Sequence, residues 1–157
     1  MLTEKLYYQD PLLKTFTATV LTCSQTENGY EVTLSATAFY PEGGGQACDL
    51  GYLENAEVLH VREKGEDIIH LCDKPLTPGE TVTGSLNWAR RLDLAQQHAG
   101  EHILSGVLHK LYGCHNTGFH VGAEVVQVDF DCIVPPEKIP EIEEMVNAAI
   151  YENIPIK

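Results

Sequence analysis

Apolar and polar residues alternate with a period of two across residues 16–87. The segments "TFTATVLTCS" and "GYEVTLSATAF" are rich in threonine, valine and aromatic residues, and the "TENG" between them is a hairpin signal. Three more strand-like segments follow at residues 56–63, 67–72 and 81–87, with turns at "KGED" and "LTPGE" between them. Several short strands with regular turns predict a small antiparallel β-barrel or sandwich.

From Asn87 the pattern changes to the period of an α-helix. Asn87 is a residue type that caps helix N-termini, Gly113 is a typical C-terminal stop, and no proline lies between them. Apolar residues at helical spacing are Leu92, Ala95, Ala99, Ile103 and Val107, and Leu104, Leu108 and Leu111 widen that stripe. The pattern predicts one long helix over about residues 88–112.

The sequence after Gly113 predicts one strand and one further helix. The stretch "AEVVQVDFD" alternates like a strand, and after "VPPEK" an acidic amphipathic helix is expected from about 137 to 152. Its apolar side carries Ile139, Ile142, Val146 and Ala149. An extended segment then begins at Pro155, which leads us to expect a C-terminally truncated product.

The composition of the chain limits which partners it can bind and indicates its cellular compartment. Lysine and arginine number 10 against 23 acidic residues, a net charge of −13, which disfavours a broad basic surface for nucleic acid. Any nucleic-acid partner must therefore be held locally, or with help from residues outside this chain. The five cysteines are scattered without a CxxC pair, and neither a signal peptide nor a long apolar run is present. We expect reduced thiols and a cytoplasmic location.

The stretch "QQHAGEHIL" contains a candidate metal-ligand pair, His98 and His102. Residues four apart on a helix share one face, with Cβ atoms roughly 6 Å apart, so both imidazoles can reach one zinc ion. On spacing alone, two ordinary surface histidines are the more common explanation. Glu101 does not directly follow the first histidine, where Ala99 stands instead, so the HExxH pattern of metalloproteases is absent. No other cysteine or histidine completes a four-ligand set.

Several motifs in order resemble a known family. The stretches are "FYPEGGGQACDLG", "WARRLDLAQQHAGEHILSGVLHKLYG", "HNTGFHVG" and "VDFD". Together they resemble the editing domain of alanyl-tRNA synthetase and its free-standing relatives, the AlaX-type trans-editing proteins, over nearly the whole chain. The resemblance implies an α+β fold. In it, an N-terminal translation-factor-like β-barrel (residues 1–87) precedes an alanyl/threonyl-tRNA synthetase-type editing domain (residues 88–157), of which only the N-terminal portion is expected here.

The resemblance also implies a zinc-dependent aminoacyl-tRNA deacylase that removes serine or glycine from mischarged alanine tRNA in trans. His98 and His102 match the first ligand pair of the family, and two further ligands are expected beyond residue 157. Position 99 is often threonine in relatives and is alanine here. The absent second pair leads us to expect weak zinc binding and poor editing by these 157 residues.

Substrate recognition has separate candidates. Gln97 and Thr117 are polar side chains that could hydrogen-bond the serine hydroxyl. The glycines of the "PEGGGQ" loop, followed by Gln46, allow close backbone approach to a ligand; the loop is expected to lean over the editing pocket, although a barrel corner is the alternative. These loop residues are Gly43, Gly44, Gly45 and Gln46.

Two other functional classes stay open at this point. One is a non-catalytic module that binds tRNA or a protein, and the other is a zinc-dependent hydrolase of small esters. An incomplete editing domain would also leave an apolar face uncovered, which favours self-association.

Overall fold

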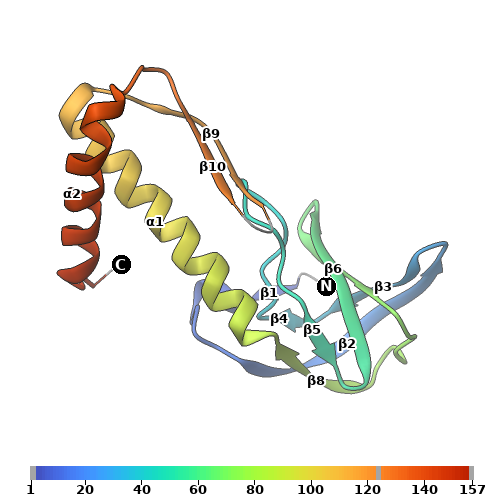
Figure 1. Cartoon of the computed structure of the whole chain (residues 1–157). Coiled ribbons are helices and arrows are strands. Elements are labelled where there is room, and N and C mark those ends of the chain that lie inside the picture. The colour runs from blue at the N-terminus through green and yellow to red at the C-terminus, as the bar shows by residue number, and fades with distance from the viewer. Residues whose placement is uncertain (1–2, 123–124, 156–157) are drawn as a thin grey trace. The chain divides into compact units, whose positions relative to one another are not determined.

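The computed structural model describes residues 3–122 and 125–155, and the described chain divides between Leu92 and Asp93 into two compact units (Figure 1). The fold is mixed α+β, as expected. Among the described residues, no helix is long and apolar enough to cross a membrane.

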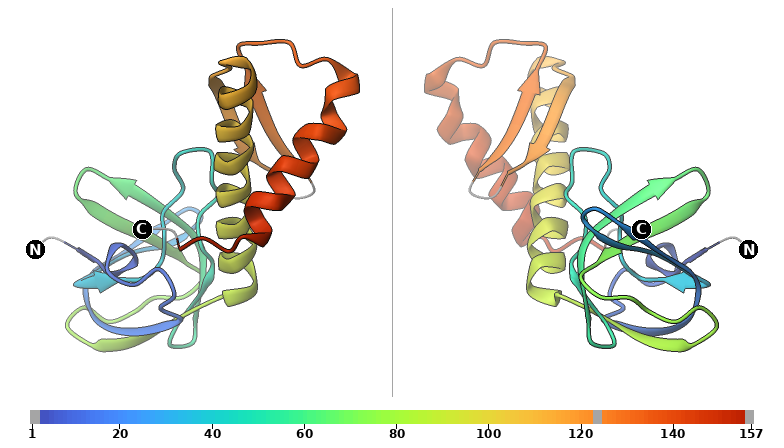
Figure 2. Two further views of the ribbon diagram at one scale, coloured as in Figure 1. Left: turned by 90° about the vertical axis from the view of Figure 1, so that its left-hand side faces the viewer. Right: turned by 90° about the vertical axis from the view of Figure 1, so that its right-hand side faces the viewer.

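The first unit is built on six antiparallel strands that close into a barrel (Figure 2). Around the barrel the strands are β2 (Thr15–Thr26), β3 (Gly29–Leu34), β7 (Asp67–Cys72), β6 (Ala56–Lys64), β5 (Gly51–Leu53) and β8 (Thr81–Leu86). The sheet closes because β8 pairs with both β2 and β5. A short 3-10 helix, η1 (Leu6–Tyr8), follows β1 (Glu4–Lys5), which pairs in parallel with β4 (Ala36–Thr37).

The apolar residues of the alternating sequence pattern fill the barrel interior. In β2 the side chains of Phe16, Ala18 and Val20 are buried while their neighbours face outward, and Val32 and Leu34 of β3 join the same core. The predicted hairpin at "TENG" is confirmed, since β2 and β3 pair from Thr26 and Gly29 onward. The sequence pattern did not predict β5, which is only three residues long.

The long helix α1 (Trp88–Tyr112) has the predicted bounds. The side-chain oxygen of Asn87 accepts the Arg90 backbone N–H at 3.2 Å, as a helix N-cap does. Gly113 has a φ of +70° and donates its N–H to the His109 carbonyl at 2.8 Å, which ends the helix.

The buried face of α1 differs in part from the predicted apolar stripe. Of that stripe, Leu92 is 41% exposed, while Leu108 is buried and Leu104 and Val107 pack against the same core, as predicted. Leu94, Arg91 and Glu101, which lie outside the predicted stripe, are also buried. Residues up to Leu92 belong to the barrel unit and the later ones to the second unit. In the second unit, Leu108 packs with Cys114 and Ile142.

The second unit packs a hairpin and another helix against α1 (Figure 2). The hairpin strands are β9 (Asn116–Val121) and β10 (Val126–Phe130), and the 3-10 turn η2 (Pro136–Lys138) leads into α2 (Ile139–Tyr151). Of the predicted apolar side of α2, Ile142 is buried while Ile139 is 54% exposed. The sequence pattern did not predict β9.

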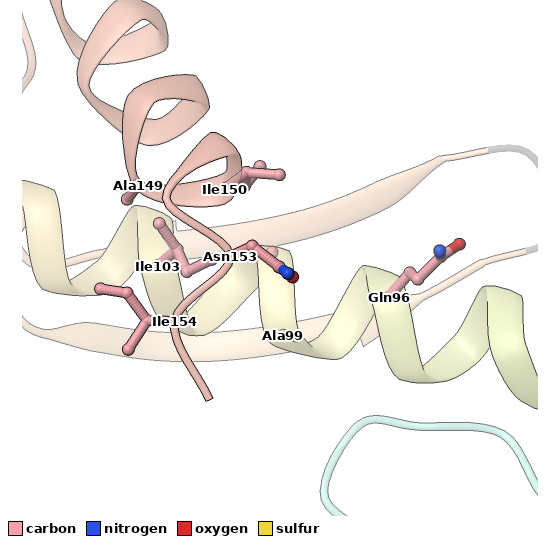
Figure 3. Close-up of a pocket in the computed structure, with 8 residues that line it drawn as sticks. Gln96, Ala99, Ile103, Ala149, Ile150, Asn153 and Ile154 are labelled. Atoms are coloured by element: carbon pink, nitrogen blue, oxygen red, sulfur yellow. The ribbon is translucent and has the colours of Figure 1, made fainter. Parts of the chain in front are cut away.

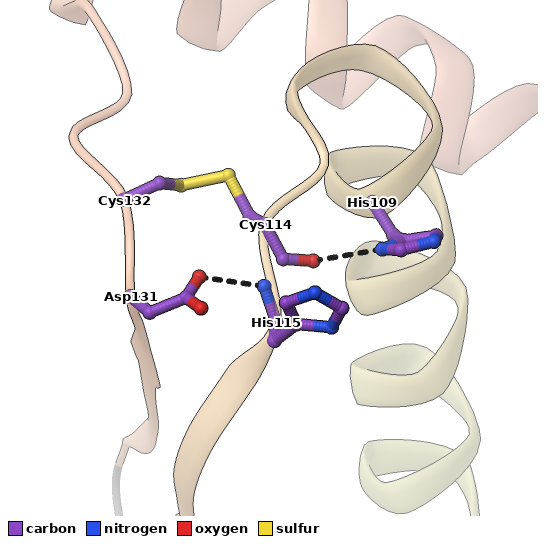
Figure 4. Close-up of a disulfide and its surroundings, with 5 residues drawn as sticks. All are labelled: His109, Cys114, His115, Asp131 and Cys132. Carbon is purple, nitrogen blue, oxygen red and sulfur yellow. Dashed lines mark hydrogen bonds between the residues drawn. A yellow bond between two sulfur atoms is a disulfide. The ribbon is translucent and has the colours of Figure 1, made fainter.

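Cys114 and Cys132 form a disulfide, with their Cα atoms 5.5 Å apart (Figure 4). The expectation of reduced thiols is therefore wrong for this pair, while Cys23, Cys48 and Cys72 are free. The two cysteines lie 18 residues apart, and the unpredicted hairpin between them brings them together. Beside them, the His115 N–H donates to Asp131 Oδ1 at 2.7 Å, and the Cys114 carbonyl oxygen lies 3.2 Å from His109 Nδ1.

Candidate metal centre on the long helix

His98 and His102 lie side by side on α1. Their ring centroids are 4.9 Å apart, with 23° between the ring planes, and this stacking agrees with their spacing of one helical turn. His98 also lies beside the Phe119 ring of β9, at 5.1 Å between centroids. The His102 side chain is 72% exposed, so one imidazole of the pair faces solvent.

Glu101 completes this group from the buried side of the helix. Only 3% of its side chain is exposed, yet its oxygens are well provided with hydrogen-bond donors. Oε1 accepts the Asn116 side-chain amide at 2.5 Å and also the hydroxyl of Ser105, one turn further along α1. Oε2 lies 3.3 Å from His102 Nδ1. The carboxylate therefore joins α1, β9 and the exposed histidine.

A bulge in the hairpin positions Asn116 for this contact. Asp129 pairs with Gly118 and Phe130 pairs with Asn116, so Thr117 is the extra residue on β9. An extra residue shifts the alternation of side chains along a strand. Both Asn116 and Phe119 can then contact α1, through Glu101 and His98 respectively.

The donor chemistry of this group suits a divalent metal ion. One donor atom from each of His98, Glu101 and His102 lies within 4.8 Å of the other two. Two imidazoles and one carboxylate are a donor set found in catalytic zinc sites. Sequence reasoning dismissed Glu101 because it compared the motif with HExxH. The spacing i, i+3, i+4 would have placed all three on one helix face.

β9 returns along α1 and places the Phe119 ring beside His98. The disulfide occupies the Cys114 sulfur, which excludes it as a thiolate ligand.

The glycine-rich loop forms a tight turn in the first unit. Gly43 and Gln46 exchange two backbone hydrogen bonds of 3.1 Å, and Gly44 and Gly45 take φ angles of +60° and +80° that favour glycine. A Cβ at Gly43 or Gly44 would meet no atom within 4 Å, so the turn presents open backbone. Gln46, by contrast, is only 8% exposed. An apposition of this loop and the histidines stays a prediction.

A buried ion pair fixes this loop to the start of α1, and sequence reasoning missed it. Arg91 and Asp49 contact through the guanidinium Nε and Nη2, at 2.5 to 3.0 Å from the carboxylate oxygens. The same carboxylate accepts the Tyr40 N–H at 2.6 Å, while Arg91 also donates to the carbonyls of Pro11 and Ala38. Tyr40 and Asp49 bracket the glycine turn, so both of its ends are held.

Gln97 and Thr117, the candidate recognition residues, are both exposed. Gln97 precedes His98 on α1, and Thr117 is the bulged residue of β9, next to Asn116. Their suggested role in reading the substrate hydroxyl stays a prediction.

An apolar groove lies on another side of α1 within the second unit (Figure 3). Its volume is about 440 Å³, and Ala99, Ile103, Ala149 and Ile154 are among its lining residues. At about 100° per residue, Ala99 and Ile103 point well away from Glu101. Because few polar groups line it, the groove is suited to binding apolar groups rather than to catalysis.

The geometry defines an α+β protein with a small antiparallel barrel in its first unit and, in its second unit, a candidate metal centre of two histidines and a glutamate on the long helix. No family model matches the chain. Alanyl-tRNA editing protein Aarsd1 of Mus musculus is 32% identical over 163 residues, which cover 94% of this chain and 39% of that protein. The alanine–tRNA ligase of Ignicoccus hospitalis is 37% identical over 163 residues, covering 99% of this chain and 18% of the ligase. The ligase of Thermoplasma acidophilum is 39% identical, with coverages of 96% and 18%.

The chain is thus a homologue of the alanyl-tRNA editing proteins and the alanine–tRNA ligases, which confirms the AlaX-type resemblance. It spans less than half the length of these relatives.

Proposed function

We propose that this protein is an aminoacyl-tRNA deacylase that hydrolyses mischarged Ser-tRNA(Ala) or Gly-tRNA(Ala) in trans, with zinc held at His98 and His102. One observation carries the proposal: the two imidazoles stack at 4.9 Å on one helix face, in a chain homologous to alanyl-tRNA editing proteins. The homology supports editing in general, and the histidine pair supports the metal.

Each residue of the centre has a proposed task. His98 and His102 hold the ion, which when bound would polarise the ester carbonyl or activate water near neutral pH. Because an aminoacyl ester is already labile, positioning and modest activation suffice. The exposed side of His102 leaves a path for the tRNA end to reach the centre.

Selection against alanine requires a site that binds the extra hydroxyl of serine. A site that hydrogen-bonds the serine hydroxyl discriminates more strongly than a pocket that only measures size. Gln97 and Thr117 are the proposed hydroxyl contacts. We propose that the turn Gly43–Gln46 contributes backbone groups to the substrate, since its glycines leave the backbone uncovered.

The alanine tRNA is proposed to be held at its 3′ end. A net charge of −13 provides no broad basic surface for the tRNA body. In this proposal residues 1–87 are a translation-factor-like domain, residues 88–157 belong to the editing domain, and the protein acts in the cytoplasm. The apolar groove beside α2 is a proposed site of self-association.

Release of the amino acid from alanine tRNA charged with serine, glycine or alanine tests the proposal. The wild-type protein should hydrolyse the serine or glycine ester and spare the alanine ester. His98→Ala and His102→Ala should each lose at least about 100-fold in rate, as expected when a group acting on the reacting centre is removed. His115→Ala, an exposed histidine outside the centre, is the matched control.

Two results would overturn the proposal. Hydrolysis of all three esters at equal rates would show that the protein does not select mischarged tRNA. Hydrolysis of a small ester such as p-nitrophenyl acetate, without any on charged tRNA, would favour the small-ester hydrolase. Binding of charged tRNA without turnover would instead favour a non-catalytic module.

A further inference from the structure

We propose that the disulfide between Cys114 and Cys132 is a reversible redox switch: its oxidised form holds the β9–β10 hairpin against α1, and its reduced form loosens the hairpin. The inference rests on the function proposed above, which supplies the cytoplasmic location and the activity that the switch controls. Disulfides are rare in cytoplasmic proteins, and those that occur there are usually catalytic or redox-sensing. A disulfide in a cytoplasmic editing protein is therefore expected to open and close.

The disulfide closes the open end of the hairpin (Figure 4). Cys114 lies two residues before β9 begins at Asn116, and Cys132 lies two residues after β10 ends at Phe130. Within the described part of the chain, β9 and β10 form a sheet of two strands. An isolated hairpin of two strands is marginally stable in water. The bond therefore adds a restraint that the pairing of the two strands does not supply.

The core that holds the hairpin to the two helices contains the disulfide itself. Among the described residues, its buried members are Leu108 of α1, Cys114 and Ile142 of α2, and Cys132 packs against them. Because this core is small, opening the bond removes a covalent link from one of its few buried side chains. Reduction should therefore increase the mobility of the hairpin.

The hairpin carries the contacts through which its mobility reaches the histidine pair. The Phe119 ring of β9 lies beside His98, with the ring centroids 5.1 Å apart. Asn116, two residues after Cys114, donates its side-chain amide to the buried carboxylate of Glu101. Loss of a group that orients a metal-binding residue typically costs 10–100-fold in affinity or activity. The redox state of the cysteines is thereby coupled to the environment of His98.

The Cys132 sulfur is the site of thiol–disulfide exchange, since Cys132 is half-buried whereas Cys114 is only 2% exposed. A glutathione thiolate attacks the Cys132 sulfur, the protein S–S bond breaks, and Cys114 leaves as a thiolate that is then protonated. A second glutathione thiolate attacks the glutathione sulfur of this mixed disulfide and releases glutathione disulfide and the Cys132 thiol. Two glutathione molecules are oxidised and one protein disulfide is reduced; the reverse sequence closes the bond.

Equilibration of wild-type protein with mixtures of reduced and oxidised glutathione tests the switch. Mass spectrometry after thiol alkylation measures the disulfide fraction, hydrogen exchange measures the mobility of β9 and β10, and Ser-tRNA(Ala) hydrolysis measures activity. We expect both forms to be populated reversibly as the glutathione ratio changes. The reduced form should exchange faster in the hairpin, with the barrel unchanged, and its kcat/KM should be at least about 10-fold lower.

Three variants separate the switch from a general loss of stability. The double variant Cys114→Ser with Cys132→Ser should match reduced wild type at every glutathione ratio. Cys23→Ser, which removes a half-buried free cysteine of the barrel, is the matched control and should respond like wild type. Asn116→Ala should lower kcat/KM while the disulfide is still closed. Should the double variant fail to fold, the reversible titration of wild type decides.

A pair that stays oxidised, or stays reduced, at every glutathione ratio would overturn the inference. Equal hairpin exchange in the two forms, or equal kcat/KM for deacylation, would do the same. If hairpin exchange follows the disulfide but neither form hydrolyses charged tRNA, the redox-dependent hairpin is kept and the proposed function fails. The two failures are therefore distinguishable.

Discussion

The guanidinium of Arg91 donates hydrogen bonds from Nε and Nη2 to the carboxylate of Asp49. Only 7% of the Arg91 side chain and 1% of the Asp49 side chain are exposed. This contact ties the first turn of α1 to the glycine-rich loop, which lies 42 residues earlier in the chain. Because Asp49 also holds the Tyr40 N–H, the pair fixes the conformation of the loop as well as its position.

Removal of one partner should strongly destabilise the barrel unit. Asp49→Ala leaves the buried Arg91 charge without its partner, and such losses cost about 3–5 kcal/mol. Urea denaturation measures the free energy of unfolding. Arg62→Met, which breaks the partly exposed pair with Glu31, should cost less than about 1 kcal/mol. Similar small effects for both variants would contradict the structural role given to Asp49.

Reduction of the disulfide should destabilise the second unit. The bond closes a loop of 18 residues, and a loop of that length contributes about 3 kcal/mol by restricting the unfolded chain. Wild type should therefore lose about that much stability in a thiol reductant. The double variant Cys114→Ser with Cys132→Ser should be equally destabilised without reductant and insensitive to it. Identical denaturation curves for oxidised and reduced wild type would show that the bond adds nothing.

Stability should fall as the pH is lowered below neutrality because of His70. Burial in the barrel lowers the pKa of His70 from 6.5 to about 4, while Thr37 and the Val32 carbonyl hold its ring nitrogens. The unfolded chain therefore binds a proton that the folded chain does not between pH 6.5 and about 4. The neutral, buried His70 thus makes a contribution to the free energy of unfolding that is complete above pH 6.5. As the pH falls to 4, roughly 3 kcal/mol of this contribution is lost.

Urea denaturation at pH 7 and pH 5 measures this dependence. His70→Gln keeps an acceptor and a donor but cannot titrate, so its difference in stability between the two pH values should be smaller than that of wild type. His60→Gln, an exposed histidine of the barrel, is the control. An equal pH dependence in His70→Gln and wild type would assign the effect to other groups.

Two neighbouring glycines of the loop should respond differently to alanine. Gly44 has a φ of +60°, so Gly44→Ala should cost about 1–2 kcal/mol of stability. Gly43 is not in that region and a Cβ there meets no atom within 4 Å, so Gly43→Ala should fold with wild-type stability. If the loop contacts the tRNA end, Gly43→Ala should nevertheless slow deacylation. Wild-type rates with Gly43→Ala would remove the loop from the substrate site.

The sequence by itself determined the long elements. Period-two alternation across residues 16–87 gave the main barrel strands, and Asn87 and Gly113 gave the ends of α1, because caps and hydrophobic periodicity are local properties. The pairing of His98 with His102 was equally local, since four residues make about one helical turn. The pattern missed β5 because three residues are too few to distinguish a strand from a loop. It missed β9, which has six residues, because Asn116, Thr117 and Gly118 at its start supply no apolar position of an alternating pattern.

Only the tertiary structure decided which groups meet across the chain. Asp49 and Arg91 are 42 residues apart, Cys114 and Cys132 are 18 apart, and no periodicity links either pair. The environment of Glu101 was likewise invisible in the sequence, because the bulged strand that brings Asn116 to its carboxylate had not been predicted. Helical spacing fixes which side chains share a face, but burial against another element decides which of them is desolvated. That burial distinguishes Glu101 from a solvated surface charge.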